Sequence, residues 1–89
     1  MDTIHQKLSE DFVNRNVELS LEFDAYLAGH PALYKKIPNG AYIIITVNGD
    51  TKFNATSVSI VKNMKRKKIV EAHKTSDRWS LRPLQLQNA

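Results

Sequence analysis

The stretch that most constrains the fold of this chain is Ile37–Asp50, an apolar segment with a turn signal at each end. Pro38-Asn39-Gly40 lies at one end, Asn48-Gly49-Asp50 lies at the other, and the residues between them carry no charge. A strand with one solvated face alternates polar and apolar residues, whereas residues 43–45 are three consecutive isoleucines. We therefore expect a strand over Ala41–Val47 that is covered on both faces, as a central strand of an α/β sheet is.

Upstream of this strand the sequence predicts two helices. A long amphipathic helix spans Thr3–Ala28 and opens with a capping box; alternatively, its first turns fray and the ordered helix starts at Ser9. His30-Pro31 breaks the chain before a short helix over Pro31–Lys36. The apolar stripe of the long helix consists of Ile4, Leu8, Phe12, Leu19, Phe23 and Leu27, and it is widened by Val13, Val17 and Leu21.

The segment after Asn48-Gly49 has two interpretations. Asn-Gly is a strong hairpin signal, and Thr56–Ile60 could supply the second strand. The competing interpretation, which we favour, is a helix over Asn54–Lys65 with Asn54 as its N-cap and lysines crowded at its C-terminus. A helix here explains why polar residues directly follow the turn, which the hairpin does not.

The rest of the chain predicts a second strand and an extended tail. Ile69–His73 reads as a strand that can pair in parallel with the first across the intervening helix. The alternative is one longer helix, because no Gly or Pro lies between Asn54 and Arg82. Trp79–Leu86 alternates in part, but Pro83 limits it to an edge strand or a tail laid over the core. Residues 85–89 are expected to fray. The fold class we predict is a small α/β (or α+β) single domain over residues 1–89, in the order α-α-β-α-β with an extended C-terminal tail or edge strand.

Length and composition set the broad class of the protein. A chain of 89 residues with 42% hydrophobic and 25% charged residues is typical of one globular domain. No run is long and apolar enough to span a membrane, and we expect no signal peptide. With no cysteine there is no disulfide and no thiolate chemistry, which fits a cytoplasmic protein.

Charge is distributed unevenly along the sequence. Residues 1–50 hold four basic and seven acidic residues, whereas residues 51–89 hold nine basic and two acidic residues. The basic half suggests an anionic partner such as nucleic acid; the alternative is that the two halves face each other within one chain or across a dimer. Candidate phosphate contacts are Lys62, Lys65, Arg66, Lys67, Lys68 and Arg78.

The sequence contains no catalytic or metal-binding signature. His5, His30 and His73 have no metal-ligand spacing, and we expect His30 to cap or pack at the helix break. Glu18 and Glu22 lie one turn apart beside the apolar stripe, where a solvated face is the simpler interpretation. We therefore expect no catalytic residue, no cofactor and no metal.

Several segments resemble an uncharacterised family of short prokaryotic proteins. The resemblance rests on the helix Glu18–Leu27, on His30-Pro31, on Ile37–Ala41, and on Phe53-Asn54 at the start of a helix. It covers roughly Glu18–Met64. It implies a helix after the Asn-Gly turn, and it implies no activity, because none is assigned to that family.

The function that the sequence favours is that of a small cytoplasmic protein–protein interaction module that forms a homodimer. A sheet of two or three strands is marginal alone, and the long helix extends beyond a core of this size. We expect the dimer interface to be centred on Phe12, Leu19 and Phe23. The alternative is a nucleic-acid-associated protein that uses the basic run Lys62–Lys68, and an enzyme is the third and least favoured class.

Overall fold

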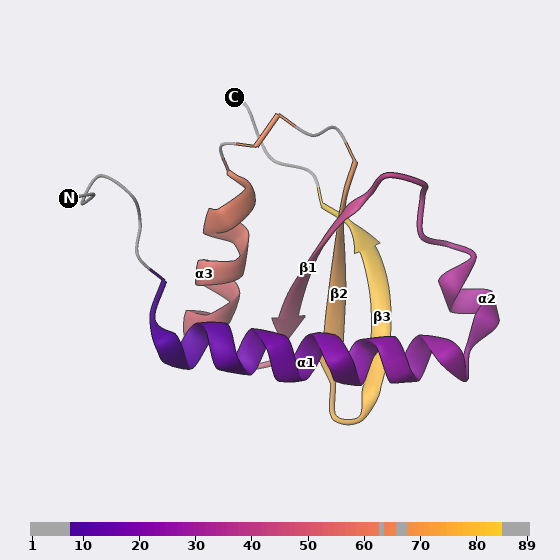
Figure 1. The fold of residues 1–89 in the computed structure, drawn as a ribbon, viewed down its shortest axis with the longest axis horizontal. Helices are drawn as coiled ribbons and strands as arrows, with labels where there is room; N and C mark the ends of the chain where they lie inside the picture. Colours follow the sequence, from indigo (N-terminus) through magenta and orange to yellow (C-terminus); the bar gives the residue numbers. More distant parts are fainter. Residues whose placement is uncertain (1–7, 63, 66–67, 85–89) are drawn as a thin grey trace.

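The computed structural model describes residues 8–62, 64–65 and 68–84. Its helices are α1 (Glu10–Ala28), α2 (Pro31–Tyr34) and α3 (Thr51–Val61), and its strands are β1 (Tyr42–Val47), β2 (Ile69–Thr75) and β3 (Arg78–Pro83). In the sheet, β2 lies between β1, to which it is parallel, and β3, to which it is antiparallel (Figure 1). The predicted α/β class and element order are therefore confirmed. In the described part of the chain, no helix has the length and apolar character that crossing a bilayer requires.

The long helix α1 has Ser9 as its N-cap, which is the later of the two predicted starts. The Ser9 hydroxyl accepts a hydrogen bond from the Phe12 amide at 3.0 Å, and two acidic residues occupy the first turn, where the helix dipole favours negative charge. The predicted capping box at residues 3–6 lies outside the described residues. At the other end, the Gly29 amide donates to the Tyr26 carbonyl, and Pro31 begins α2, which ends two residues before the predicted Lys36.

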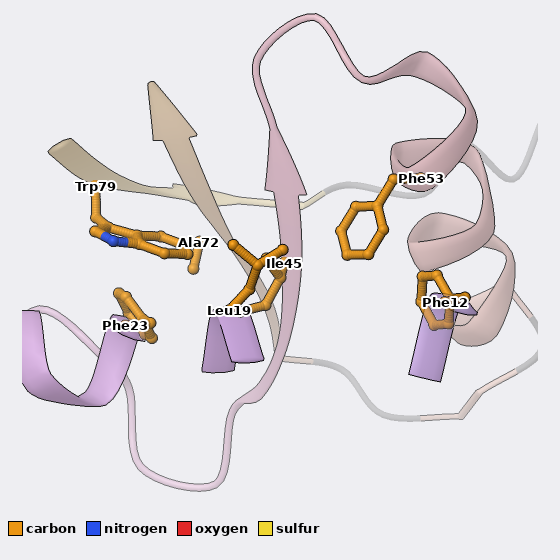
Figure 2. Packing of buried hydrophobic residues seen from close by; sticks show 7 residues of the cluster. All are labelled: Phe12, Leu19, Phe23, Ile45, Phe53, Ala72 and Trp79. Carbon is orange, nitrogen blue, oxygen red and sulfur yellow. The ribbon is translucent and has the colours of Figure 1, made fainter. Parts of the chain in front are cut away.

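The main core lies between α1 and one face of the sheet. Phe12, Leu19 and Phe23 of α1 pack against residues from all three strands, namely Ile45, Ala72 and Trp79 (Figure 2). The ring centres of Phe23 and Trp79 lie 4.9 Å apart, and the ring centres of Phe12 and Phe53 are separated by the same distance. Aromatic side chains provide much of this core because each buries a large apolar area. The helix α1 is thus held across the strands (Figure 1).

A second core lies on the opposite face of the sheet, under α3. Ile44 of β1 alternates with Ile45, so it points away from α1 and packs with Val61 and Ile69. Both faces of β1 are therefore covered, as its apolar sequence predicted. The expectation that β1 is a central strand is wrong, because β1 is an edge strand and β2 occupies the centre.

The contested segment is helical, and the hairpin interpretation is wrong. The chain turns at Gly49, where φ is +83° and the Asp50 amide donates to the Val47 carbonyl at 3.1 Å. Asp50, not Asn54, caps α3, since its carboxylate accepts a hydrogen bond from the Phe53 amide at 3.2 Å. An Asn-Gly turn therefore leads here into a helix rather than into a second strand.

Asn54 has a different task from the predicted cap. Its side-chain oxygen accepts a hydrogen bond from the Val47 amide at 2.7 Å, and its side-chain nitrogen donates to the Val47 carbonyl at 2.8 Å. The amide group thus pairs with the end of the edge strand as a neighbouring strand would. This pairing fastens the first turn of α3 to β1.

The C-terminal segment forms the second edge of the sheet. A tight turn at Ser76 and Asp77 joins β2 to β3, with Ser76 at a φ of +58°. Trp79 pairs with Lys74 and faces α1, and Pro83 ends the strand. The predicted edge strand is confirmed, and the predicted fraying of residues 85–89 concerns residues outside the described part.

Candidate functional site

The outward surface of α1 carries an apolar stripe that stays exposed among the residues the structure describes. Val13, Val17 and Leu21, which we call the outer stripe, are 42, 52 and 64% exposed. They follow one another at four-residue intervals, so they lie along one side of the helix, away from the buried Phe12, Leu19 and Phe23. Large apolar side chains gathered in this way on a surface mark an interaction site more often than isolated ones do.

Acidic residues surround the outer stripe. The helix carries Glu10, Asp11, Glu18, Glu22 and Asp24 against a single basic residue, Arg15. Arg15 is already engaged, because its guanidinium pairs with Asp50 and lies 4.9 Å from the centre of the Phe53 ring. This pairing, with the Phe53 amide, holds the pKa of Asp50 below its usual value. Glu22 pairs with Lys74 at 2.7 Å, and the other acidic residues make the outer surface of α1 negatively charged beside its apolar centre.

A shallow hollow continues the outer stripe at the junction of α1 and α2. It is lined by Asp24, Leu27, Ala28, Pro31 and Tyr34. Asp24 and Ala28 follow Leu21 by about one and two helical turns on the same side of the helix. The Tyr34 residue is 63% exposed, so its ring offers further apolar area at this end.

On the sheet face opposite α1, a chain of hydrogen bonds joins all three strands. The Thr46 hydroxyl of β1 donates to the Glu71 carboxylate of β2 at 2.5 Å, and it lies 2.7 Å from His73 Nδ1. Arg82 of β3 donates to the same Glu71 oxygen at 2.8 Å. Thr46 is 2% exposed, and the side chains of Glu71 and His73 are 14 and 16% exposed. These residues form a largely buried polar cluster beside the open part of the sheet.

The hydrogen bonds of this cluster determine the proton positions. Burial by itself disfavours the charged form of Glu71, but the hydrogen bonds from Thr46 and Arg82 outweigh it and hold the pKa of Glu71 below its usual value. Because Thr46 gives its only proton to the ionised Glu71, its oxygen must accept a proton from His73 Nδ1. Neutral His73 is thus held as the Nδ1–H tautomer, with Nε2 as its free basic atom.

The other histidine at a candidate site has a structural role. His30 Nδ1 lies 2.7 Å from the Tyr26 carbonyl, and the two rings stack with centres 3.8 Å apart. His30 therefore caps the last turn of α1, as the sequence predicted. A second shallow hollow beside it is lined by Tyr26, His30, Leu33, Lys36 and Trp79, among others. In the described part of the chain, no three side chains of metal-binding type gather into one group.

The predicted phosphate contacts are separated in space. Lys62, Lys65 and Lys68 are exposed between the end of α3 and the start of β2, whereas Arg78 pairs with Thr75 at the other end of that strand. The strand has seven residues and so spans about 20 Å. Arg66 and Lys67 lie outside the described residues. Arg78 therefore does not extend the lysine group.

The predicted dimer contacts lie inside the protomer. Phe12, Leu19 and Phe23 are 9, 7 and 3% exposed, because the sheet and α3 already cover them within a single chain. No interface centred on these three side chains is accessible on this fold. The exposed apolar side of α1 is the outer stripe, so the prediction that Val13, Val17 and Leu21 widen the buried stripe is wrong.

A family model matches residues 11–74 of this chain, and the family it describes is a family of unknown function, DUF5647. The chain belongs to this family. The resemblance drawn from the helix, the His-Pro break and the Phe-Asn pair is therefore confirmed. No curated protein and no solved structure matches the chain.

The DUF5647 match contains most of both candidate sites. It runs from the first turn of α1 into β2, so it includes the outer stripe and also Thr46, Glu71 and His73, but not β3. Sequence reasoning missed the polar cluster. The sequence feature that could have indicated this cluster is the spacing of Glu71 and His73, which lie two residues apart and so on one side of a predicted strand.

Proposed function

We propose that this protein is a protein–protein interaction module that binds a basic amphipathic helix along the outer surface of α1. The observation that carries the proposal is the outer stripe, with Val13, Val17 and Leu21 each more than 40% exposed on one side of a helix. Covering these side chains removes apolar area from water at roughly 25 cal/mol per Å². The described residues leave this area exposed, and in this proposal a partner covers it.

The spacing of the exposed residues fits a helical partner. Val17, Leu21, Asp24 and Ala28 follow one another at intervals of four, three and four residues, which is the seam spacing of paired helices. From Val13 to Ala28 the surface extends about 22 Å along the helix axis. An amphipathic helix of about four turns covers this length, and the hollow beside Tyr34 receives its last apolar side chain.

The charge of the surface supports a basic partner. Asp24 lies within the line of contact, and Glu10 and Glu18 lie beside it. In an antiparallel pairing of two copies centred on Val17, Glu10 of one copy would face Asp24 of the other, and like charges across an interface oppose association. A helix with Lys or Arg beside its apolar stripe gains attraction at the same positions. The predicted homodimer stays a prediction, and it is an outcome of the test below.

The proposed site of action is the cytoplasm. The cysteine-free sequence fits a reducing compartment. The proposal involves no cofactor and no metal, since the contact described is one of apolar packing and charge.

A designed pair of peptides tests the proposal. The first is an amphipathic helix with leucines at alternating three- and four-residue intervals and flanking lysines; the second has glutamates in place of the lysines. Amide chemical shifts of the isotope-labelled full chain are followed while each peptide is added. We expect the basic peptide to shift residues 13–28 and Tyr34 saturably, and the acidic peptide to leave them unchanged. Equal responses to both peptides, shifts confined to other elements, or a mass near twice 10.1 kDa without any peptide response would contradict the proposal.

A further inference from the structure

We propose that the open face of β2 and β3, on the side of the sheet opposite the outer stripe, is a binding site for a phosphate monoester. Alternation along β3 places Arg78, Ser80 and Arg82 on this face, because the intervening Trp79 and Leu81 pack with the core under α1. Register pairs Ser80 with His73 and Arg82 with Glu71. Two arginines thus flank a serine at the exposed edge of the sheet.

Arg82 is held in position before any ligand binds. Its guanidinium donates one hydrogen bond to Glu71, at 2.8 Å, and its side chain is still 54% exposed. The planar guanidinium has further N–H groups that point away from this bond, and a fork of this kind matches the oxygens of a phosphate. An arginine already oriented by a buried carboxylate loses less side-chain freedom when it binds an anion.

Arg78 and Ser80 supply donors that no described residue accepts. Both are exposed, and within the described residues their side chains form no ion pair or hydrogen bond. The Cα atoms of Arg78 and Arg82 are about 13 Å apart on an extended strand. Both long side chains can lean over Ser80 from either side, where a single phosphate would accept hydrogen bonds from all three residues.

The polar cluster beneath this face contributes to its charge. Glu71 is the one carboxylate on this part of the sheet, and Arg82 and Thr46 are both bonded to it. Arg78 and Arg82 against Glu71 give the strand residues of this face a net positive charge, and Asp77 lies in the turn next to Arg78. His73 lies opposite Ser80 in the strand register, and its Nδ1 is engaged with the Thr46 hydroxyl.

The kinds of side chain on the outward positions of β2 and β3 favour one class of ligand. Phosphate contacts by themselves are blind to the rest of the ligand, and proteins that bind single-stranded nucleic acid add aromatic side chains on which bases stack. The outward residues of β2 and β3 are Glu71, His73, Thr75, Arg78, Ser80 and Arg82, with no Phe, Tyr or Trp among them. A compact phosphate monoester fits this face better than a nucleic-acid strand.

Amide chemical shifts of the labelled full chain during titration with phenyl phosphate test this site. The ionic strength is held constant with chloride. We expect saturable shifts at Ser80, Arg82 and His73, and a loss of affinity of about tenfold in Arg78→Gln, because one charged hydrogen-bonding partner is removed. Lys35→Gln removes the same charge from an exposed position next to α2 and is the matched control. It should bind phenyl phosphate as the unaltered chain does.

Three results would overturn the proposal. The first is an equal loss in Lys35→Gln and Arg78→Gln, which would mean general charge attraction. The second is the same shifts produced by chloride alone. The third is saturation of these amides by a single-stranded oligonucleotide with no response to phenyl phosphate, which would assign the face to nucleic acid instead. Because Ser80→Ala alters only an exposed hydroxyl, its affinity provides a second measurement if Arg78→Gln is poorly folded, and we expect it to fall by about threefold.

Discussion

The side-chain amide of Asn54 forms two hydrogen bonds with the backbone of one residue, Val47, at 2.7 and 2.8 Å. One side chain thereby satisfies both outward-facing backbone groups at the end of an edge strand, where unpaired groups are otherwise available to other strands. The same contact sets the position of α3 relative to β1, and the adjacent Phe53 packs its side chain into the main core. The Phe-Asn pair therefore joins a helix to a sheet edge.

Replacing Asn54 tests this role. Asn54→Ala removes both hydrogen bonds and leaves two partly buried backbone groups unpaired, so we expect the free energy of unfolding to fall by about 2 kcal/mol. Asn48→Ala is the matched control, because Asn48 is exposed in the preceding turn. It should change stability by about 0.5 kcal/mol or less. Denaturant unfolding measures the stability of the two variants. Equal losses of stability would show that the hydrogen bonds between Asn54 and Val47 do not stabilise the fold.

A second prediction separates core residues from the outer stripe. Ile44 is 4% exposed and packs with Val61 and Ile69, so Ile44→Ala should cost about 2 to 5 kcal/mol. Leu21→Ala removes a side chain from a residue that is 64% exposed, and it should cost about 0.5 kcal/mol or less. The midpoints of chemical denaturation measure both. A large loss in Leu21→Ala would mean that the outer stripe is part of the fold rather than a free surface.

Local sequence rules predicted much of the fold. The turns at Gly40 and Gly49 and the apolar run between them defined β1, and Gly29 with Pro31 defined the break between α1 and α2. Strand order was less predictable, because an apolar strand covered on both faces can be central or, as here, an edge strand flanked by two helices. The cap of α3 was misplaced because Asp50 and Asn54 are both good caps, and only the fold shows that Asn54 bonds to Val47.

The polar cluster and the outer stripe depend on information that a single sequence lacks. Thr46 and His73 meet only because β1 and β2 pair in one particular register, in which Thr46 lies opposite His73. On α1, Phe12 and Val13 are adjacent apolar residues, and the helical pattern alone does not say which of two apolar stripes faces the sheet. The structure shows that the stripe of Phe12, Leu19 and Phe23 faces the sheet, because its larger side chains fill the space between helix and sheet.

A third prediction concerns the tautomer of His73. Because Thr46 donates to Glu71, neutral His73 should carry its proton on Nδ1, which two-bond proton–nitrogen spectra of the imidazole report directly. Thr46→Val keeps the shape of the side chain but removes the hydroxyl. We expect the Nδ1–H preference to be lost and stability to fall by about 1 to 3 kcal/mol. Finding the Nε2–H tautomer in the unaltered chain would refute the proposed direction of these hydrogen bonds.

A fourth prediction concerns acid. The pKa values of Glu71 and Asp50 are lowered in the folded chain, so each carboxylate stabilises the fold fully above its ordinary pKa, near 4.5 and 3.8. That contribution is lost as the pH falls from there through the lowered, folded-state pKa. We expect Glu71→Gln to be less stable than the unaltered chain at neutral pH, and the difference to shrink below about pH 4. Unfolding curves across this range measure it, and a difference that does not change with pH would contradict the proposed role of the charge.

The binding of a basic amphipathic peptide to α1 shows whether the outer stripe is a binding surface. The measurement is the dissociation constant of the leucine–lysine peptide for three chains: the unaltered protein, Val17→Asp and Asn14→Asp. Both variants add one negative charge to an exposed position of the same helix, but only Val17 belongs to the outer stripe. We predict that Val17→Asp weakens binding by about tenfold or more, because a charge is placed in the apolar contact, while Asn14→Asp leaves the affinity unchanged or slightly higher. Equal affinities for Val17→Asp and the unaltered chain would contradict the account.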